Sequence, residues 1–263
     1  MSVKNKWIII FKILAFNVEV ALVRDQIFRN SGTTRIARLQ FWKDAIDSIY
    51  GDGIIPRQPV AAALNCFAKS ANVNLLRLLI TARQRTLGDR PFDSIEAVSK
   101  YGVYTYGSVI KLIMEILSDY LAGVNEIEAA AKAANSMGEA MAMINLLRTI
   151  APLISRGIVL LPADLLKTYN LTAEQICFQQ ASALPSLAKD LCFSAETFIK
   201  KSRLCIKELT PALRLALMAN GVTVDYVLRI SQRCNYNIFD RRLQMSCSFL
   251  PWRLWWRRFS QIY

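Results

Sequence analysis

The stretch "AMAMINLLRTIAPLISRGIVLLP", residues 140–162, has the apolar pattern of a buried helix but keeps three strongly polar side chains. These are one amide, Asn145, and two arginines, Arg148 and Arg156, and the stretch contains no carboxylate. Because a buried polar group needs a hydrogen-bonding partner, we expect a core helix. Two interpretations of Asn145 and Arg148 stay open: they bind an anionic ligand, or they hydrogen-bond to the backbone or to a neighbouring carboxylate.

Helical patterns recur along the rest of the 263 residues. Glycine and proline are sparse, and apolar residues in segments such as 35–50 fall three and four positions apart, which is typical of one helix face. No strand alternation or internal repeat is visible. The sequence therefore predicts an all-α protein with a single domain over residues 1–263. The expected helices cover about 7–29, 35–50, 59–70, 74–87, 126–150, 181–206, 210–219 and 223–232.

Three local signals predict where helices begin or end. Asp93 and Glu96 have the spacing of a capping box before an apolar segment. Thr172 is expected to cap a helix that follows a turn at Asn170. Pro152 is expected to end or kink the helix of the opening stretch, since proline removes a backbone donor.

The composition excludes several kinds of chemistry. The chain has no histidine, which removes histidine-based acid–base catalysis and histidine metal ligands. Its six cysteines form no C-x-x-C pair, so we expect buried, reduced thiols and neither a metal site nor a cofactor. The net charge of +13 favours an anionic partner or a compartment rich in basic proteins. No nucleic-acid-binding module is visible, and no nucleic-acid partner is expected.

The N-terminal segment is mainly aliphatic, whereas the C-terminal segment is aromatic and basic. In the first 25 residues, Lys12 and Glu19 interrupt the apolar sequence. No uninterrupted apolar stretch reaches the roughly 20 residues that a membrane span needs. This segment therefore predicts a core helix. The C-terminal segment, about 248–263, mixes aromatic and basic residues and suits an anionic membrane surface or a protein interface. The alternative is a last helix that packs its tryptophans inward and its arginines outward. The candidate contact residues are Trp252, Arg253, Trp255, Trp256, Arg257 and Arg258.

Five segments spread over nearly the whole chain occur in a recognisable order. They are "AFNVEVALVRD" (15–25), "RLQFWKDAIDSIYG" (38–51), "PRQPVAAAL" (56–64), "MGEAMAMINLLRTIAPLISRGIVLLPADLL" (137–166) and "NYNIFDRRL" (235–243). Together they resemble the squalene/phytoene synthase family. The resemblance implies a helical bundle of the isoprenoid-synthase type around a central cavity. In active members, aspartates on two helices hold magnesium ions, which bind the diphosphate of a prenyl substrate.

The chain departs from both aspartate motifs of this family. At the first motif it has Ala21 and Leu22 where acids are expected, and it keeps only Asp25. Glu19 lies about 120° from Asp25 around a helix and is a poor partner for it. At the second motif, Thr149 and Leu153 replace the two acids. We therefore expect a protein that is not an enzyme, with no catalytic residue, no metal and a vestigial pocket. The pocket residues are Glu19, Asp25, Asn145, Arg148 and Arg156.

Further motifs resemble one branch of this family, the complex I assembly factor 6 group. They are F-N-x-E-x-A-x-V-R-D at 16–25, R-x-Q-F-W at 38–42 and Q-P-V-A at 58–61. The resemblance implies a mitochondrial matrix protein on the inner membrane that supports early assembly of the ND1-containing arm of complex I. Assembly intermediates and other assembly factors would be its partners. Two alternatives stay open: an active head-to-head prenyl synthase, and a carrier that holds a lipid or isoprenoid in the cavity.

Overall fold

The computed structural model describes residues 3–25, 32–51, 53–67, 71–88, 91–118, 123–178, 182–247 and 249–260. These residues form helices and the turns that connect them, and no strand occurs among them. The prediction of an all-α fold is therefore confirmed. The chain divides into two compact units, residues 1–88 with 108–120, and residues 89–107 with 121–263.

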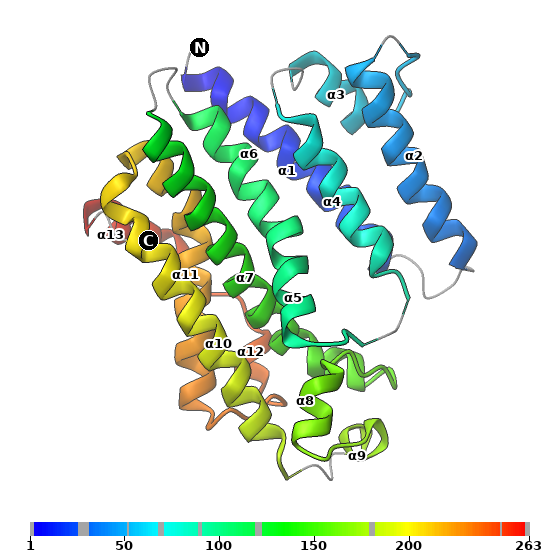
Figure 1. Ribbon diagram of the computed structural model, residues 1–263, viewed down its shortest axis with the longest axis vertical. Coiled ribbons are helices and arrows are strands. Elements are labelled where there is room, and N and C mark those ends of the chain that lie inside the picture. Colours follow the sequence, from blue (N-terminus) through cyan, green and yellow to red (C-terminus); the bar gives the residue numbers. More distant parts are fainter. Residues whose placement is uncertain are drawn as a thin grey trace. The chain divides into compact units, whose positions relative to one another are not determined.

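The first unit packs around the N-terminal helix α1 (Figure 1). Apolar residues of α1 recur every three or four positions and are buried, and Phe16 meets Trp42 edge to face with ring centroids 5.4 Å apart. The segment predicted as a first core helix is thus part of a core, as expected. The helices of this unit are α1 (Val3–Asp25), α2 (Gly32–Tyr50), α3 (Pro59–Phe67), α4 (Val73–Arg85) and α6 (Ser108–Leu117).

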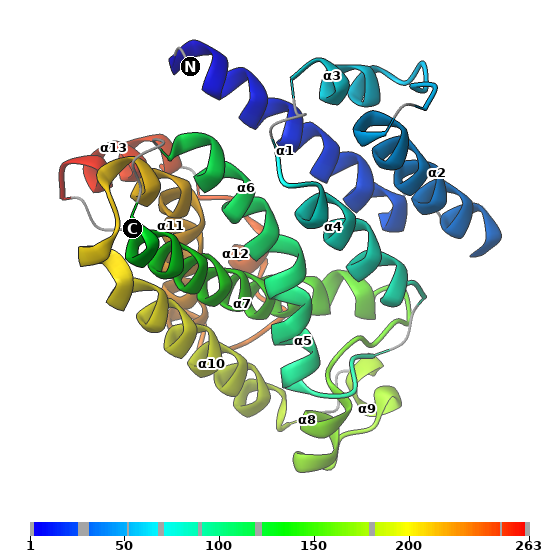
Figure 2. The same cartoon turned by 45° about the horizontal axis from the view of Figure 1, so that its top comes forward.

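The second unit is built around one long helix, α7 (Val124–Ile154), which contains most of the opening stretch. Helix α7 packs against α5, α10 and α11 (Figure 2). In the described part of the chain it is the one helix long and apolar enough to cross a membrane, and most of that apolar window is buried in the protein. The other elements are α5 (Ile95–Gly102), the π-helical turn η1 (Val103–Gly107), α8 (Ala163–Thr168), α9 (Ala173–Cys177), α10 (Leu184–Leu204), the 3-10 turn η2 (Cys205–Glu208), α11 (Pro211–Arg233), α12 (Arg241–Gln244) and α13 (Leu250–Ser260).

Glycines allow α7 to approach α5 and η1 closely. A Cβ atom on Gly102 would lie 2.5 Å from the carbonyl oxygen of Gly138. A Cβ atom on Gly138 would lie 2.6 Å from the amide nitrogen of Gly107. The backbones touch here, so a side chain at either position would push the two helices apart.

Two of the expected helix boundaries are wrong. Ser94, not Asp93, caps α5, because its hydroxyl oxygen accepts from the amide of Ala97 at 3.2 Å. The two helices expected at 210–219 and 223–232 form one helix, α11, which runs through the buried Gly221 without a break. Packing on α7 and α10 overrides the weak helix preference of that glycine.

The other boundary signals are confirmed. Thr172 caps α9 in a capping box with Gln175, after a turn in which Asn170 has a φ of 50°. Pro152 lies in the last turn of α7. The helix then closes with Gly157 at a φ of 72°, and the amide of Ile158 donates to the carbonyl of Leu153 at 3.0 Å, as in a Schellman motif.

Candidate functional site

Arg148 has a partner that is not a carboxylate. Its side chain is partly buried, and its Nε donates to the backbone carbonyl of Leu243 in α12 at 3.0 Å. The side-chain amide of Gln244 donates in return to the carbonyl of Arg148 at 2.7 Å. A backbone carbonyl thus fills the role of the missing acid, and Arg148 fastens α12 to α7.

The other polar residues of the opening stretch are spread along α7 and its end. Asn145 lies one turn before Arg148 and is half-buried, while Thr149 is exposed and donates to the carbonyl of Leu146 at 2.8 Å. Arg156 lies two turns beyond Arg148, on the exposed turn that closes the helix. Asn145 and Arg148 thus lie one turn apart on α7, and Arg156 lies beyond the end of that helix.

The acidic members of the expected pocket belong to α1 in the first unit. Glu19 is half-buried there, and Leu22, in a motif position, is exposed. Asp25 ends the helix, and its side chain lies outside the part of the chain that the structure describes. Among the residues that are described, no three acids or cysteines are grouped as metal ligands would be.

Helix α12 is stabilised at its start by the charged pair Asp240 and Arg242. The carboxylate of Asp240 caps α12 by accepting from the amide of Arg242 at 2.8 Å, and it also accepts from the Arg242 guanidinium. These hydrogen bonds hold the pKa of Asp240 well below its usual range. The cap positions the carbonyl of Leu243 that Arg148 uses.

The six cysteines are free thiols in different surroundings. Cys192 and Cys234 are buried, and burial raises the pKa of Cys192 to about 11. Cys66 is exposed, so the expectation that all the thiols are buried is wrong there. It lies in the last turn of α3, a helix in which Ala61 and Leu64 supply the buried side.

The C-terminal helix α13 is oriented opposite to the packed-tryptophan alternative. Trp252 and Trp256 are each 70% exposed, and Trp255 and Phe259 are exposed as well. Arg253, by contrast, is partly buried, and its guanidinium lies 5.6 Å from the ring centre of Tyr226 in α11. Arg253 and Arg257 face the protein, whereas Arg258 and the tryptophans are exposed.

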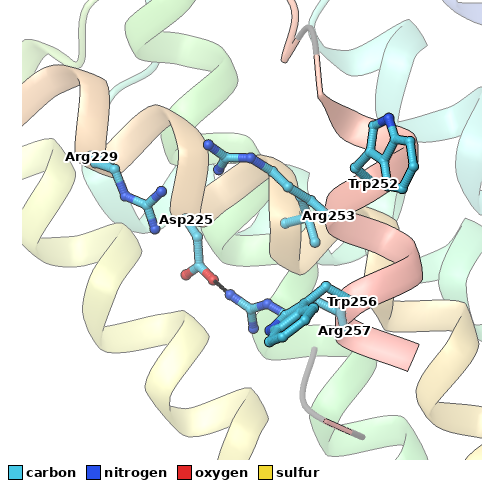
Figure 3. Close-up of a pocket in the computed structure, with 7 residues that line it drawn as sticks. Asp225, Arg229, Trp252, Arg253, Trp256 and Arg257 are labelled. Carbon is cyan, nitrogen blue, oxygen red and sulfur yellow. Dashed lines mark hydrogen bonds and ion pairs between the residues drawn. The ribbon is translucent and has the colours of Figure 1, made fainter. Parts of the chain in front are cut away.

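One carboxylate on α11 explains this orientation. Asp225 accepts a hydrogen bond from Arg257 of α13 (Figure 3). It also pairs with Arg203 of α10 at 2.7 Å. The three side chains are mostly shielded from solvent, which strengthens their attraction. Asp225 therefore ties together α10, α11 and α13.

A pocket of about 350 Å³ opens beside this ion pair, between α11 and α13. Its walls carry three arginines against one carboxylate, and two tryptophans form part of its edge (Figure 3). A second pocket of about 350 Å³, between α10 and α11, shares Asp225 and Arg229 with it. The first pocket is lined by Val222, Asp225, Arg229, Trp252, Arg253, Trp256 and Arg257. We call these seven residues the arginine–tryptophan pocket.

The sequence singled out Trp252, Arg253, Trp256 and Arg257 as contact residues but missed the α11 side of this pocket. Asp225 and Arg229 lie four positions apart, a helical spacing that was open to inspection. Nothing in the local sequence, however, connects them to a helix almost thirty residues further on.

The helical architecture and a matching family model define a class of protein. The squalene/phytoene synthase family model matches residues 8–248, and the chain belongs to this family. The chain also superimposes on a crystal structure of a dehydrosqualene synthase with a TM-score of 0.79. That comparison covers 98% of this chain and 87% of the other at 19% identity, and it supports the fold.

Two curated relatives are more similar in sequence. The mouse protein named NADH dehydrogenase (ubiquinone) complex I, assembly factor 6 is 30% identical over 250 residues, which cover 93% of this chain and 72% of that protein. The human protein of the same name is 29% identical over 255 residues, covering 95% of this chain and 74% of the relative. This chain is thus similar to complex I assembly factors over nearly its full length.

Proposed function

We propose that this protein is a non-catalytic assembly factor for mitochondrial complex I, built on a prenyl synthase fold. The observation that carries the proposal is its similarity, over more than nine-tenths of the chain, to relatives named as such factors. The proposed action is binding: the protein holds an assembly intermediate, and no bond is made or broken.

The motif residues support the absence of catalysis. Ionising a prenyl diphosphate requires magnesium ions that neutralise the leaving group, and magnesium needs several hard oxygen ligands. Of the five motif positions where the family's acids are expected, only Asp25 is acidic. Arg148, which an active site would direct at diphosphate, donates to the Leu243 carbonyl instead. A single carboxylate cannot assemble the metal cluster that the reaction needs.

The proposed location is the matrix side of the inner membrane, with peripheral attachment through α13. The net charge of +13 favours an anionic surface, and exposed tryptophans are typical of residues at a membrane interface. The proposed partners are assembly factors and the early intermediate that contains ND1. The names of the relatives support a role in complex I assembly. The involvement of ND1 and of an early stage of assembly is our proposal.

The assembly role is tested in cells that lack this protein. Native gels should show loss of fully assembled complex I, with the other respiratory complexes unchanged, and wild-type protein should restore it. Pulse-labelling of mitochondrial translation products should show that the ND1-containing intermediate is the first one to be lost. Normal complex I in these cells would contradict the proposal. A defect that begins in an intermediate without ND1 would contradict the proposed stage.

The absence of catalysis is tested with purified protein, magnesium, and farnesyl or geranylgeranyl diphosphate. We expect no release of diphosphate above a protein-free control, while a dehydrosqualene synthase assayed in parallel releases it. Turnover that stops when magnesium is chelated would contradict the proposal and favour the alternative of an active prenyl synthase.

A further inference from the structure

The outward face of α13 is a continuous aromatic surface. The rings of Trp252 and Trp255 lie 6.3 Å apart, and those of Trp255 and Phe259 lie 4.7 Å apart, so three neighbouring rings cover one side of the helix. All three side chains are more than half exposed. Such a surface costs free energy in water and gains it at the headgroup level of a bilayer, where tryptophan is enriched.

The arginine–tryptophan pocket, beside this surface, contains two guanidinium groups whose N–H donors are available to a ligand. Arg229 is exposed and forms no hydrogen bond or ion pair with any residue that the structure describes. Arg253 lies over the ring of Tyr226. Its guanidinium forms no ion pair with any acid in the part of the chain that the structure describes. Asp225 is already shared between Arg203 and Arg257, so it does not neutralise the other two.

The combination selects a particular ligand. A guanidinium presents a planar fork of donors that matches the oxygens of a phosphate group. Here the fork lies next to tryptophans that favour the interfacial layer of a membrane, which is where a phospholipid carries its phosphate. A volume of about 350 Å³ is within the usual range of small-ligand sites and accepts a headgroup phosphate.

We infer that the arginine–tryptophan pocket binds the phosphate of an anionic phospholipid in a bilayer. Trp252 and Trp256 insert at the interface, and Arg229 and Arg253 donate to the phosphate oxygens. The Asp225–Arg257 ion pair holds α13 against α11 in the orientation that this requires. The inference deepens the proposed membrane attachment and rests on it.

The sharpest test compares two arginines on α11 that are one turn apart. Arg229 lines the pocket, whereas Arg233 is also exposed but does not line it, so Arg229→Gln and Arg233→Gln remove the same charge from neighbouring surfaces. Binding is measured by flotation with vesicles of phosphatidylcholine alone or mixed with cardiolipin. We expect Arg229→Gln to weaken binding to the anionic vesicles about fivefold, and Arg233→Gln to change it far less.

Further variants distinguish the pocket from general attraction. Adding Arg253→Gln to Arg229→Gln should deepen the loss, whereas the double variant Arg233→Gln/Arg241→Gln, with the same net charge, should not. Circular dichroism of each variant checks that it is folded. Equal losses in the pocket variants and their charge-matched controls would mean diffuse electrostatics and would overturn the inference.

Two more outcomes separate the membrane from other sources of phosphate. Bromine-labelled acyl chains should quench the fluorescence of the wild type and should quench Trp252→Phe/Trp256→Phe less. Inorganic phosphate should compete only weakly, because it lacks the interfacial contacts; full displacement by it would identify a soluble phosphate ligand and overturn the inference.

If the wild type floats but the pocket variants float equally well, the pocket fails while the membrane attachment stands. If the wild type does not float at all, the attachment itself fails, and the assembly role is judged separately by the native gels.

Discussion

The guanidinium of Arg148 donates to a carbonyl that a neighbouring helix supplies, and this pairing has a measurable consequence. Arg148→Ala leaves the Leu243 carbonyl without its donor, while the hydrogen bond from Gln244 to the backbone carbonyl of residue 148 remains. We expect a loss of about 1–3 kcal/mol in the free energy of unfolding, since the hydrogen bond involves a charged group in a partly buried place. Urea denaturation measures this loss. Arg233→Gln serves as the control, and an Arg148 variant as stable as that control would contradict the role given to Arg148.

Asp240 gives the stability of the same region a pH dependence. Arg242 lowers the pKa of this carboxyl in the folded protein, so the ionised form stabilises the fold. That contribution is fully present above the pKa of an unfolded aspartate, about 3.9, and is lost as the pH falls toward the lower folded pKa. Wild type should therefore be more stable than Asp240→Asn at pH 7, and the difference should shrink below about pH 4. Urea midpoints of both proteins across this range test the prediction, which a constant difference would contradict.

At the scale of single residues, the sequence drew attention to Arg148 and Arg257 but did not predict what they contact. Arg148 donates to a backbone carbonyl and Arg257 to an aspartate, and both partners lie far away in the sequence. Such pairings depend on the packing of whole helices, which no local pattern contains.

At the scale of elements, the crossing of α7 with α5 and η1 depends on the absence of side chains. Gly138→Ala places a methyl group within 3 Å of the backbone at Gly107 and Gly102. We expect a loss of about 1–3 kcal/mol or more, because two helix backbones must separate. Thermal unfolding measures the loss. Gly123→Ala is the control, since a Cβ atom there meets nothing within 4 Å. An unchanged melting temperature in Gly138→Ala would contradict this close contact.

Helix α13 shows why element positions are easier to predict than orientations. Trp252 and Trp256 are four residues apart, and so are Arg253 and Arg257. Both pairs therefore form a face with helical spacing, and either face is able to pack. Asp225, on another helix, decides the matter by attracting Arg257. The sequence alone left both orientations open.

Helix boundaries illustrate a related limit. The pattern of apolar residues located the core helices to within a few positions, since it reflects burial directly. It divided α11 at Gly221, where local preference argues for a break and packing on α7 holds the helix together. Local preference is a small term compared with the burial of a full helix face.

For the whole molecule, we predicted a single domain, while the chain divides into two compact units. The chain passes from one unit to the other within the segment that contains α5, η1 and α6. We propose that the units unfold together, because each is assembled from two separate segments of the chain and neither is one continuous piece. Differential scanning calorimetry should show one transition whose calorimetric and van't Hoff enthalpies agree. Two resolved transitions would contradict the single-domain prediction.

The proposed role depends on whether the pocket expected from the family motifs has any chemical task. Asp25 is the last acid at the motif positions of the family. If the protein acts by binding alone, removing this acid leaves complex I assembly unaffected. The most direct measurement is the amount of assembled complex I, by native gel, in cells that lack the protein and are supplied with wild type or with Asp25→Asn at matched levels. The account predicts equal restoration by both forms. Restoration by the wild type alone, with the variant folded and equally abundant, would contradict it and assign the carboxylate a reaction or a ligand.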